Sequence, residues 1–394
     1  MISQKMTELG KKRSVIREIF EYGNKRRAEI GAENVFDFSL GNPSIPAPEV
    51  VNQTMIRLLT EKDAVSLHGY TSAQGALPVR QAIADNINER FSAGATPDLL
   101  YMTCGAAASL TISLHAIVNS GDEVIALAPF FPEYKVFAEK AGAELKVVKC
   151  REEDFQIDFK ALEEAVTPKT KAIIVNSPNN PSGAVLNKET ITELASLLNK
   201  KSQEYGNDIF IIADEPYREL VYGGIEVPYI PNFYNNTLVC YSFSKSLSLP
   251  GERIGYIFVS PNVNNCGDVY AAVCGAGRAL GFVCAPSLLQ FTVAETLGTT
   301  SDISIYEKNR NLLYNALTEY GYKVVSPDGA FYLFVKSPEE DASAFCEKAK
   351  TQEILIVPGD DFGYPGYVRI SYCVSTAMIE KSLKGFEKLI KEYR

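Results

Sequence analysis

The chain has 394 residues, 46% of them hydrophobic, and a net charge of −9. This length and composition suit a globular protein of about two domains at ~150 residues each, and the acidity argues against nucleic acid or an anionic membrane surface as a partner. No apolar run approaches the ~18 residues of a membrane span, and the first residues hold no apolar signal core, so we expect a cytoplasmic protein that does not bind a membrane.

Histidine is scarce, since only His68 and His115 occur in the whole chain. This leaves almost no material for a histidine-rich metal site or a histidine relay, and we expect no metal. No Gly-x-Gly-x-x-Gly follows an apolar strand and no Gly-x-x-x-x-Gly-Lys-Ser/Thr occurs, which weakens dinucleotide and P-loop interpretations. The chemistry must therefore use other side chains.

Short apolar runs alternate with segments of helical periodicity from the turn at Gly41-Asn42-Pro43 to about residue 280. Between two of these runs, Asn187 can cap a helix that stops before Gly206. Alternation of this kind predicts an α/β fold whose mostly parallel sheet, of the seven-stranded type, is flanked by helices. The apolar runs lie at residues 123–128, 172–176, 209–213, 238–241 and 254–259.

The last third of the chain has a different pattern. A segment of helical periodicity stops at Gly321, and short apolar strands follow near residues 332–335 and 368–371. This pattern predicts a smaller α+β domain.

No low-complexity linker separates the parts, so we expect the N-terminal segment to pack back onto the smaller domain. A long helix is expected to bridge the two domains near residues 285–300. The sequence thus predicts a large domain over residues 46–283 and a small domain formed by residues 1–45 and 284–394.

Lys245 stands out because it lies among hydroxyl groups directly after the apolar run at residues 238–241, where we expect a loop. A lysine amine attacks carbonyls to form a Schiff base, provided that a cationic neighbour or partial desolvation lowers its pKa. Arg253 could supply that charge. The alternative is a surface lysine in a serine-rich turn.

The order Ser-x-Ser-Lys followed by Gly-x-Arg-x-Gly, from Ser242 to Gly255, resembles the pyridoxal-phosphate lysine segment of class I/II aminotransferases. The resemblance implies that Lys245 holds the cofactor as a Schiff base and later carries a proton at the substrate.

Asp214 follows the apolar run at residues 209–213, at the carboxyl end of a strand, where open α/β sheets place ligands. A buried carboxylate is costly unless a positive group meets it, although a lone Asp can equally cap the next helix. The segment Asp214-Glu215-Pro216-Tyr217 resembles the aminotransferase strand whose aspartate pairs with the pyridinium nitrogen of the cofactor.

A cluster of Asn, Pro and Gly is by itself typical of a turn, and one occurs in the segment Asn176-Ser177-Pro178-Asn179-Asn180-Pro181-Ser182-Gly183. It also resembles the Asn-x-Pro-x-Asn-Pro-Thr/Ser-Gly signature of the same family. The resemblance implies that Asn180 bonds the ring oxygen of the cofactor and that Tyr217 helps to hold this oxygen as a phenolate.

Small residues at positions 103–110 begin an apolar helix, whose free N–H groups and dipole favour an anion. Close packing explains such a helix start equally well. With the resemblance, we expect a cradle for the cofactor phosphate formed by Ala106, Ala107, Ser242, Ser244 and Arg253.

Two aromatic residues are assigned by the resemblance. Phe131, in Pro129-Phe130-Phe131-Pro132, matches the ring that stacks on the pyridine, although buried aromatics more often belong to the core. Tyr70 matches the tyrosine that reaches the phosphate of the neighbouring subunit. This match implies a homodimer with shared active sites.

Arg369 lies within the short apolar strand at residues 368–371, where a charge is rarely buried without a partner. Its planar fork suits a carboxylate, although an internal ion pair is the alternative. The resemblance assigns Arg369 to the α-carboxylate of the substrate, with the backbone of Gly41 closing over it.

Substrate choice is less defined. Ala107 stands where some dicarboxylate-specific relatives carry lysine. Arg278 lies roughly where another subgroup reads a distal carboxylate across the dimer, and the alternative is a solvated arginine in a glycine-rich loop.

The quoted motifs run in family order from Gly41 to Arg369, and the chain is identified as a member of the fold-type I, class I/II pyridoxal-phosphate aminotransferases. The resemblance implies transfer of an amino group between an L-amino acid and a 2-oxo acid such as 2-oxoglutarate. Aspartate is the favoured amino acid. Carbon–sulfur lyases and cyclopropane-carboxylate synthases share nearly all these residues and stay open as alternatives. A noncatalytic aminotransferase-like regulator would need a DNA-binding segment, and residues 1–40 are too short and too weakly basic for one.

Overall fold

The computed structural model describes residues 2–11 and 15–394. The described chain forms two compact units, a smaller one of residues 2–11, 15–44, 304–327 and 331–394 and a larger one of residues 45–303 and 328–330. Residues 1 and 12–14 of the expected small domain lie outside the described residues. Residues 284–303, expected in the small domain, group with the larger unit, and the assignment of domains stays a prediction.

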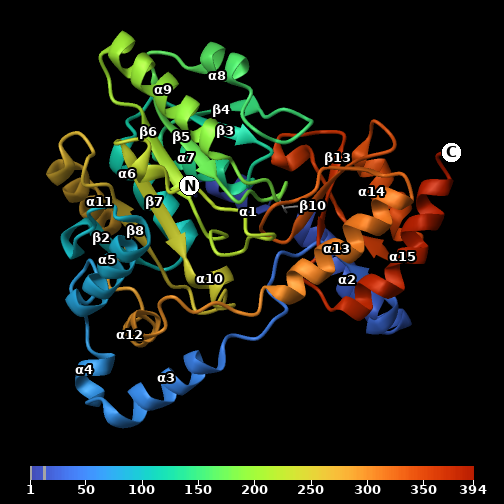
Figure 1. The fold of residues 1–394 in the computed structure, drawn as a ribbon, viewed down its shortest axis with the longest axis horizontal. Helices are drawn as coiled ribbons and strands as arrows, with labels where there is room; N and C mark the ends of the chain where they lie inside the picture. The colour runs from blue at the N-terminus through green and yellow to red at the C-terminus, as the bar shows by residue number, and fades with distance from the viewer. Residues whose placement is uncertain (1, 12–14) are drawn as a thin grey trace. The chain divides into compact units, whose positions relative to one another are not determined.

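The larger unit is built on the predicted seven-stranded sheet, with helices packed around it (Figure 1). The strand order is β2-β8-β7-β6-β5-β3-β4, in which β8 runs antiparallel to β2 and β7 and the other neighbours are parallel. The strands are β2 (Leu100–Thr103), β3 (Glu123–Ala128), β4 (Glu144–Lys149), β5 (Thr170–Asn176), β6 (Phe210–Asp214), β7 (Thr237–Ser242) and β8 (Gly255–Val259).

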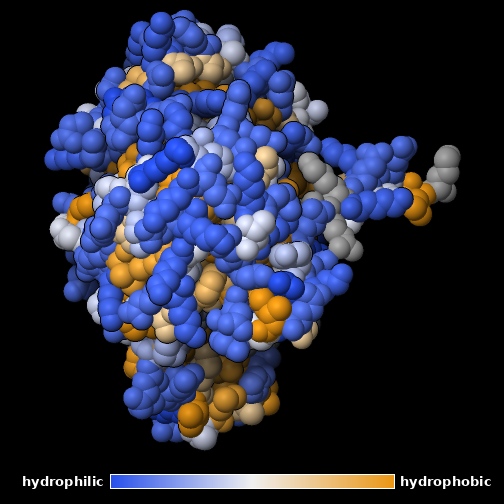
Figure 2. Space-filling model, turned by 90° about the vertical axis from the view of Figure 1, so that its right-hand side faces the viewer, coloured by the Kyte–Doolittle hydropathy of each residue, from blue (hydrophilic) through white to orange (hydrophobic). Residues whose placement is uncertain are grey.

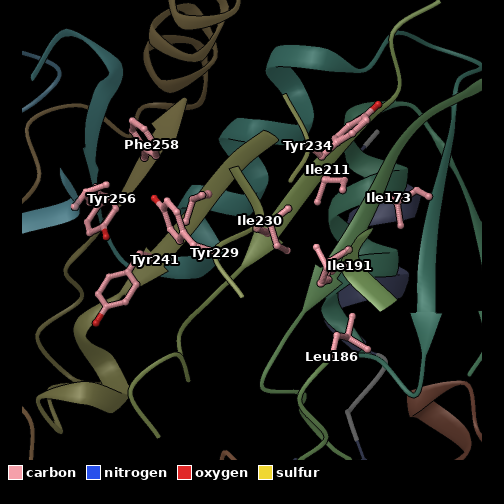
Figure 3. Close-up of a cluster of buried hydrophobic side chains, with 14 of the residues drawn as sticks. Ile173, Leu186, Ile191, Ile211, Tyr229, Ile230, Tyr234, Tyr241, Tyr256 and Phe258 are labelled. Atoms are coloured by element: carbon pink, nitrogen blue, oxygen red, sulfur yellow. The ribbon is translucent and has the colours of Figure 1, made fainter. Parts of the chain in front are cut away.

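The central strands are buried along their whole length, which explains why they appear in the sequence as continuous apolar runs. Figure 3 shows part of the core, in which Ile173 of β5 and Ile211 of β6 lie near Ile191. Outside the core, the face drawn in Figure 2 is mostly hydrophilic, with hydrophobic residues gathered at its lower end.

The helices of the larger unit follow the sequence signals in most places. Asn187 caps α9, its side-chain oxygen accepting from the Thr190 N–H at 2.8 Å, and Gly206 ends the helix in the left-handed conformation. The helices are α3 (Glu49–Glu61), α4 (Ala64–His68), α5 (Leu77–Phe91), α6 (Ala106–Ile117), α7 (Glu133–Ala141), α8 (Phe159–Ala165), α9 (Lys188–Tyr205), α10 (Phe243–Ser246), α11 (Cys266–Leu280) and α12 (Ser287–Glu295).

The prediction of a long bridging helix near residues 285–300 is wrong. The structure has the shorter α12 there, and Gly298 follows with φ of +80°. Glycine readily adopts this left-handed conformation, which no α-helix continues through, so the chain turns before the next helix.

The smaller unit joins the two ends of the chain. Phe36 of β1 pairs with Ile354 of β11, and an antiparallel sheet of order β12-β13-β10-β9 lies in the same unit. The unit contains α1 (Gln4–Lys11), α2 (Val15–Ile30), β1 (Phe36–Asp37), α13 (Ser304–Glu319), β9 (Lys323–Val324), β10 (Tyr332–Lys336), α14 (Ala342–Lys350), β11 (Ile354–Leu355), β12 (Val357–Pro358), β13 (Tyr367–Ser371) and α15 (Thr376–Lys391). None of the helices described in either unit is long and apolar enough to cross a membrane.

Candidate active site

Asp214, Lys245 and the segment that begins at Asn176 lie at the carboxyl edge of the sheet in the larger unit. Parallel neighbours end together there, because Asn176 at the end of β5 pairs with Asp214 at the end of β6, and Asp214 pairs with Cys240 of β7. Lys245 follows β7 directly. The strand ends thus hold an acid and a lysine at one edge of the sheet, the place where open α/β sheets bind ligands.

Lys245 lies in the one-turn helix α10, and not in the loop that the sequence predicts. Ser242 begins this helix, because its hydroxyl accepts a hydrogen bond from the Ser244 N–H at 3.2 Å. The Ser242 and Ser244 hydroxyls are also bonded to each other at 2.7 Å. The capped turn fixes the backbone of the lysine, whose side chain is half-buried.

Asp214 is a buried acid, with 5% of its surface exposed. The Tyr134 hydroxyl donates to one carboxyl oxygen, Oδ2, at 2.5 Å. The other oxygen, Oδ1, is buried and has no hydrogen-bond partner among residues 2–11 and 15–394. Burial raises the pKa of Asp214 from 3.8 to about 7, even though the Tyr134 hydrogen bond opposes the shift. A positive group at Oδ1 would remove this penalty.

Tyr134 is a site residue that the sequence analysis missed. It lies on α7, three residues after Phe131, and the two rings meet edge to face with centroids 5.8 Å apart. Its position in the aromatic segment after β3 was the available signal, but nothing in the sequence pairs it with Asp214.

Glu215 and Arg218 form a second feature that the sequence did not reveal, a buried ion pair with a 2.5 Å contact. Arg218 also donates to the backbone oxygens of Val227 and Pro228. A buried pair of this kind is satisfied by these additional bonds, and it holds the turn that follows Asp214.

The residues from which we expect an anion cradle lie around the place where β2, β7 and β8 meet. Gly255 pairs with Ser242 on one side and with Thr103 on the other. A Cβ at Gly105 would lie 2.7 Å from Nη2 of Arg253, so the guanidinium packs against the backbone at the start of α6.

Gly105 has a φ of +85°, and Ala106 and Ala107 follow as the first residues of α6. Their N–H groups lie in the first turn, which has no intrahelical acceptors for its amides. The first turn of α6 and the Arg253 guanidinium therefore lie together, next to the strand end that carries Ser242, and such groups suit a phosphate.

Asn180, Tyr217 and Phe131 belong to the same unit. Asn180 and Tyr217 are buried, and the Asn180 N–H donates to the Asn176 side-chain oxygen at 2.8 Å. The neighbouring Asn179 amide donates to the Pro129 oxygen at 3.2 Å, which ties this turn to the segment that carries Phe131.

Tyr70 and Arg278 are exposed in this chain. Tyr70 follows α4 and has 98% of its surface accessible. Arg278 lies in the last turn of α11, because residues 275–280 are helical and do not form the glycine-rich loop considered as an alternative.

Arg369 and Gly41 lie in the smaller unit, where Arg369 is 3% exposed on β13. Its Nη2 donates to the Ser39 oxygen at 2.6 Å, and its guanidinium carbon lies 4.8 Å from the centre of the Tyr332 ring. A Cβ at Gly41 would overlap the Tyr332 hydroxyl, so only glycine fits there. A guanidinium held flat in this way can present a fork to a carboxylate.

Known proteins match this chain along its length. The family model of aminotransferase class I and II matches residues 33–386. An aspartate aminotransferase of Thermotoga maritima is 30% identical over 397 residues, which cover 99% of this chain and 99% of that protein.

Solved structures agree with these matches. An amino transferase of Eubacterium rectale is 57% identical with a TM-score of 0.99, covering 100% of this chain and 99% of that one. An aspartate aminotransferase of Thermus thermophilus with maleate is 28% identical with a TM-score of 0.86, covering 99% of this chain and 100% of that one. The chain therefore belongs to the class I and II aminotransferases and is a transaminase.

Proposed function

We propose that this transaminase uses pyridoxal 5'-phosphate, held covalently by Lys245, to move an amino group between L-aspartate and a 2-oxo acid such as 2-oxoglutarate. The observation that carries the proposal is the buried Oδ1 of Asp214, which has no hydrogen-bond partner in the described parts of the chain. A protonated pyridine nitrogen supplies the cation that such an oxygen requires.

The residues present fit the other groups of this cofactor as well. The start of α6, the two serine hydroxyls and Arg253 suit the phosphate, and Lys245 on α10 is a half-buried amine near them in the fold. When bound, pyridoxal phosphate supplies an electron sink for negative charge at the substrate α-carbon.

Each protein group then has a definite task. Asp214 holds a proton at the pyridine nitrogen, and its bond from Tyr134 keeps the carboxylate in place. Lys245 Nζ, as a free amine, would take the proton from the substrate α-carbon and pass it to the cofactor carbon in the first half of the reaction, and it would carry a proton in the opposite direction in the second half. Because the capped helical turn holds the backbone of Lys245 in place, its amine can return to the same position for each proton transfer.

The remaining groups would orient the reactants. Asn180 and Tyr217 would bind the ring oxygen of the cofactor, Phe131 would pack on its ring, and Arg369 would bind the substrate α-carboxylate, with the Gly41 backbone beside it. The buried guanidinium suits this role because a desolvated arginine binds a planar carboxylate more strongly than a solvated one.

Aspartate is the favoured donor because two of the similar proteins are named aspartate aminotransferases, and one of them was solved with maleate, itself a dicarboxylate. Ala107 provides no charge for a second carboxylate. We propose that Arg278 of the partner subunit binds the second carboxylate of the substrate.

A cytoplasmic homodimer with shared sites completes the proposal. Val50, Ile56, Leu59 and Val65 are exposed on α3 and α4, and Tyr70 follows them with 98% of its surface accessible. Exposed apolar residues gathered in this way favour an interface between subunits, and they account for an aromatic residue left in solvent by one chain.

The proposal is tested by the visible spectrum of the purified protein and by screening amino donors with 2-oxoglutarate and pyruvate. We expect a cofactor absorption band and release of a keto acid. The Lys245→Ala variant should bind the cofactor noncovalently and lose turnover, and retained transamination in this variant would refute the role of Lys245. Ammonia or sulfide as the main product would indicate a lyase.

A further inference from the structure

A pocket in the larger unit adjoins α10, the short helix that carries Lys245. It opens to solvent and has a cavity volume of about 180 Å³, which is enough space for a small molecule. Its walls come from α5, the end of β7, β8, α10 and the loop after α12. Neither Lys245 nor Asp214 lines it.

Opposite charges meet in the wall of this pocket. Nη1 of Arg90 lies 3.0 Å from Oε1 of Glu219, and the Tyr241 hydroxyl donates to Oε2 of the same carboxylate at 2.8 Å. The Glu219 side chain is 12% exposed and that of Arg90 is 37% exposed. A guanidinium has five N–H donors and a carboxylate about four acceptor sites, so both groups can bind more.

Tyr256 adds an aromatic ring with a hydroxyl to the wall. The residue is 8% exposed, and its ring stacks on Tyr241 with centroids 5.0 Å apart. Figure 3 shows Tyr241 and Tyr256 side by side, with Tyr229 next to them. A phenol hydroxyl in the wall of an open pocket can bond either water or a polar group of a ligand.

We propose that this pocket binds a free α-amino acid, with its carboxylate at Arg90 and its ammonium group at Glu219. A simple anion would meet repulsion from Glu219, and a simple cation would meet repulsion from Arg90, whereas a zwitterion matches both charges. The choice of amino acids rests on the transaminase assignment, since these are the molecules that such an enzyme handles.

The apolar part of the wall suits an aliphatic or aromatic side chain. Ile83, Phe243 and Leu247 line the pocket next to the polar groups. Apolar surface beside a charged pair is what an amino acid with a hydrophobic side chain requires.

The location of the pocket suggests how a bound amino acid would regulate the enzyme, because the pocket adjoins the helix that carries Lys245. Phe243 and Ser246 lie on one face of α10 by their spacing, and Leu247, which follows the helix, lines the pocket with them, whereas Lys245 does not. The Ser246 oxygen accepts from the Ser301 N–H at 2.8 Å, which anchors that face. An amino acid in the pocket therefore packs against the helix that holds Lys245 and stabilises one position of it.

The test is equilibrium dialysis of the full chain with 1-aminocyclohexanecarboxylate, a zwitterion that has no hydrogen on its α-carbon and so cannot undergo the amino transfer. We expect binding to the wild type. The Arg90→Gln variant and the pocket-filling Thr299→Leu variant should each bind at least about tenfold more weakly, because one loses a charged contact and the other loses space. Arg151→Gln, which changes an exposed ion pair with Asp154, is the matched control and should bind normally.

Arg369→Ala separates the pocket from the candidate active site, and we expect it to retain binding. Loss of binding in Arg369→Ala together with normal binding in Arg90→Gln would overturn the proposal, as would no binding to the wild type. Cyclohexanecarboxylate, which lacks the ammonium group, should bind at least about tenfold more weakly, and equal binding would reject the zwitterion. Because no turnover is measured, failure here leaves the roles proposed for Lys245 and Asp214 untouched.

Discussion

Asp214 is expected to titrate near neutral pH in the cofactor-free protein and to lose this titration when the cofactor binds. Burial raises its pKa from 3.8 to about 7, which is a shift of about 3 units. At 1.36 kcal/mol per unit, the empty site disfavours the charged carboxylate by about 4 kcal/mol. A pyridinium N–H at Oδ1 offsets this penalty and returns the pKa to well below neutral pH.

The sign of the effect on stability follows from the direction of the shift. Because the folded-state pKa lies above the unfolded one, the stabilising contribution of Asp214 is complete below pH 3.8 and is lost as the pH rises through about 7. Relative to Asp214→Asn, which cannot ionise, the cofactor-free wild type should therefore lose up to about 4 kcal/mol of unfolding free energy between pH 4 and 8.

Infrared difference spectroscopy measures this group directly. The protonated carboxyl band that is present in the wild type and absent in Asp214→Asn should disappear with a midpoint near pH 7 in the cofactor-free protein. With pyridoxal phosphate bound, the band should be absent throughout the range from pH 5 to 8 if the ring nitrogen pairs with Oδ1. A midpoint below about pH 5 in the empty protein, or a midpoint that the cofactor does not change, would refute the reasoning.

Three further substitutions test other parts of the site. Tyr134→Phe removes a hydrogen bond to the Asp214 carboxylate worth about 1.5–3 kcal/mol, so the same infrared assay should show the Asp214 pKa raised by a further ~1–2 units; an unchanged midpoint contradicts this. Gly105→Ala places a methyl group against Arg253 at a position whose φ is +85°. Spectrophotometric titration should therefore show that the variant binds the cofactor at least about tenfold more weakly than the wild type does. An affinity equal to that of the wild type would argue against the phosphate cradle. Arg278→Ala should lower kcat/KM for aspartate by at least about tenfold and leave that for alanine unchanged, and equal losses reject the distal-carboxylate role.

The sheet could be predicted from the sequence because its central strands are buried on both faces. Such strands appear as continuous apolar runs, and the runs at residues 209–213 and 238–241 match β6 and β7 to within one residue at each end. The α9 helix was equally visible because Asn187 and Gly206 mark its two ends.

Other features depend on contacts that a local pattern does not record. The bond between Tyr134 and Asp214 joins residues 80 positions apart, and neither residue type alone indicates the other. The α10 turn is four residues long, too short for helical periodicity to reveal. Glycines near Arg278 suggested a loop, yet α11 continues there because a Cβ at Gly277 would overlap the Tyr101 hydroxyl, so close packing overrides the weak helix propensity of glycine.

The covalent link to Lys245 is the central claim, and borohydride reduction of the cofactor-loaded protein tests it most directly. Peptide mass mapping should then place a stable pyridoxyl group on Lys245, and the Lys245→Ala variant should carry none. A pyridoxyl group on a different lysine, or no label on a protein that nevertheless transaminates, would contradict the account.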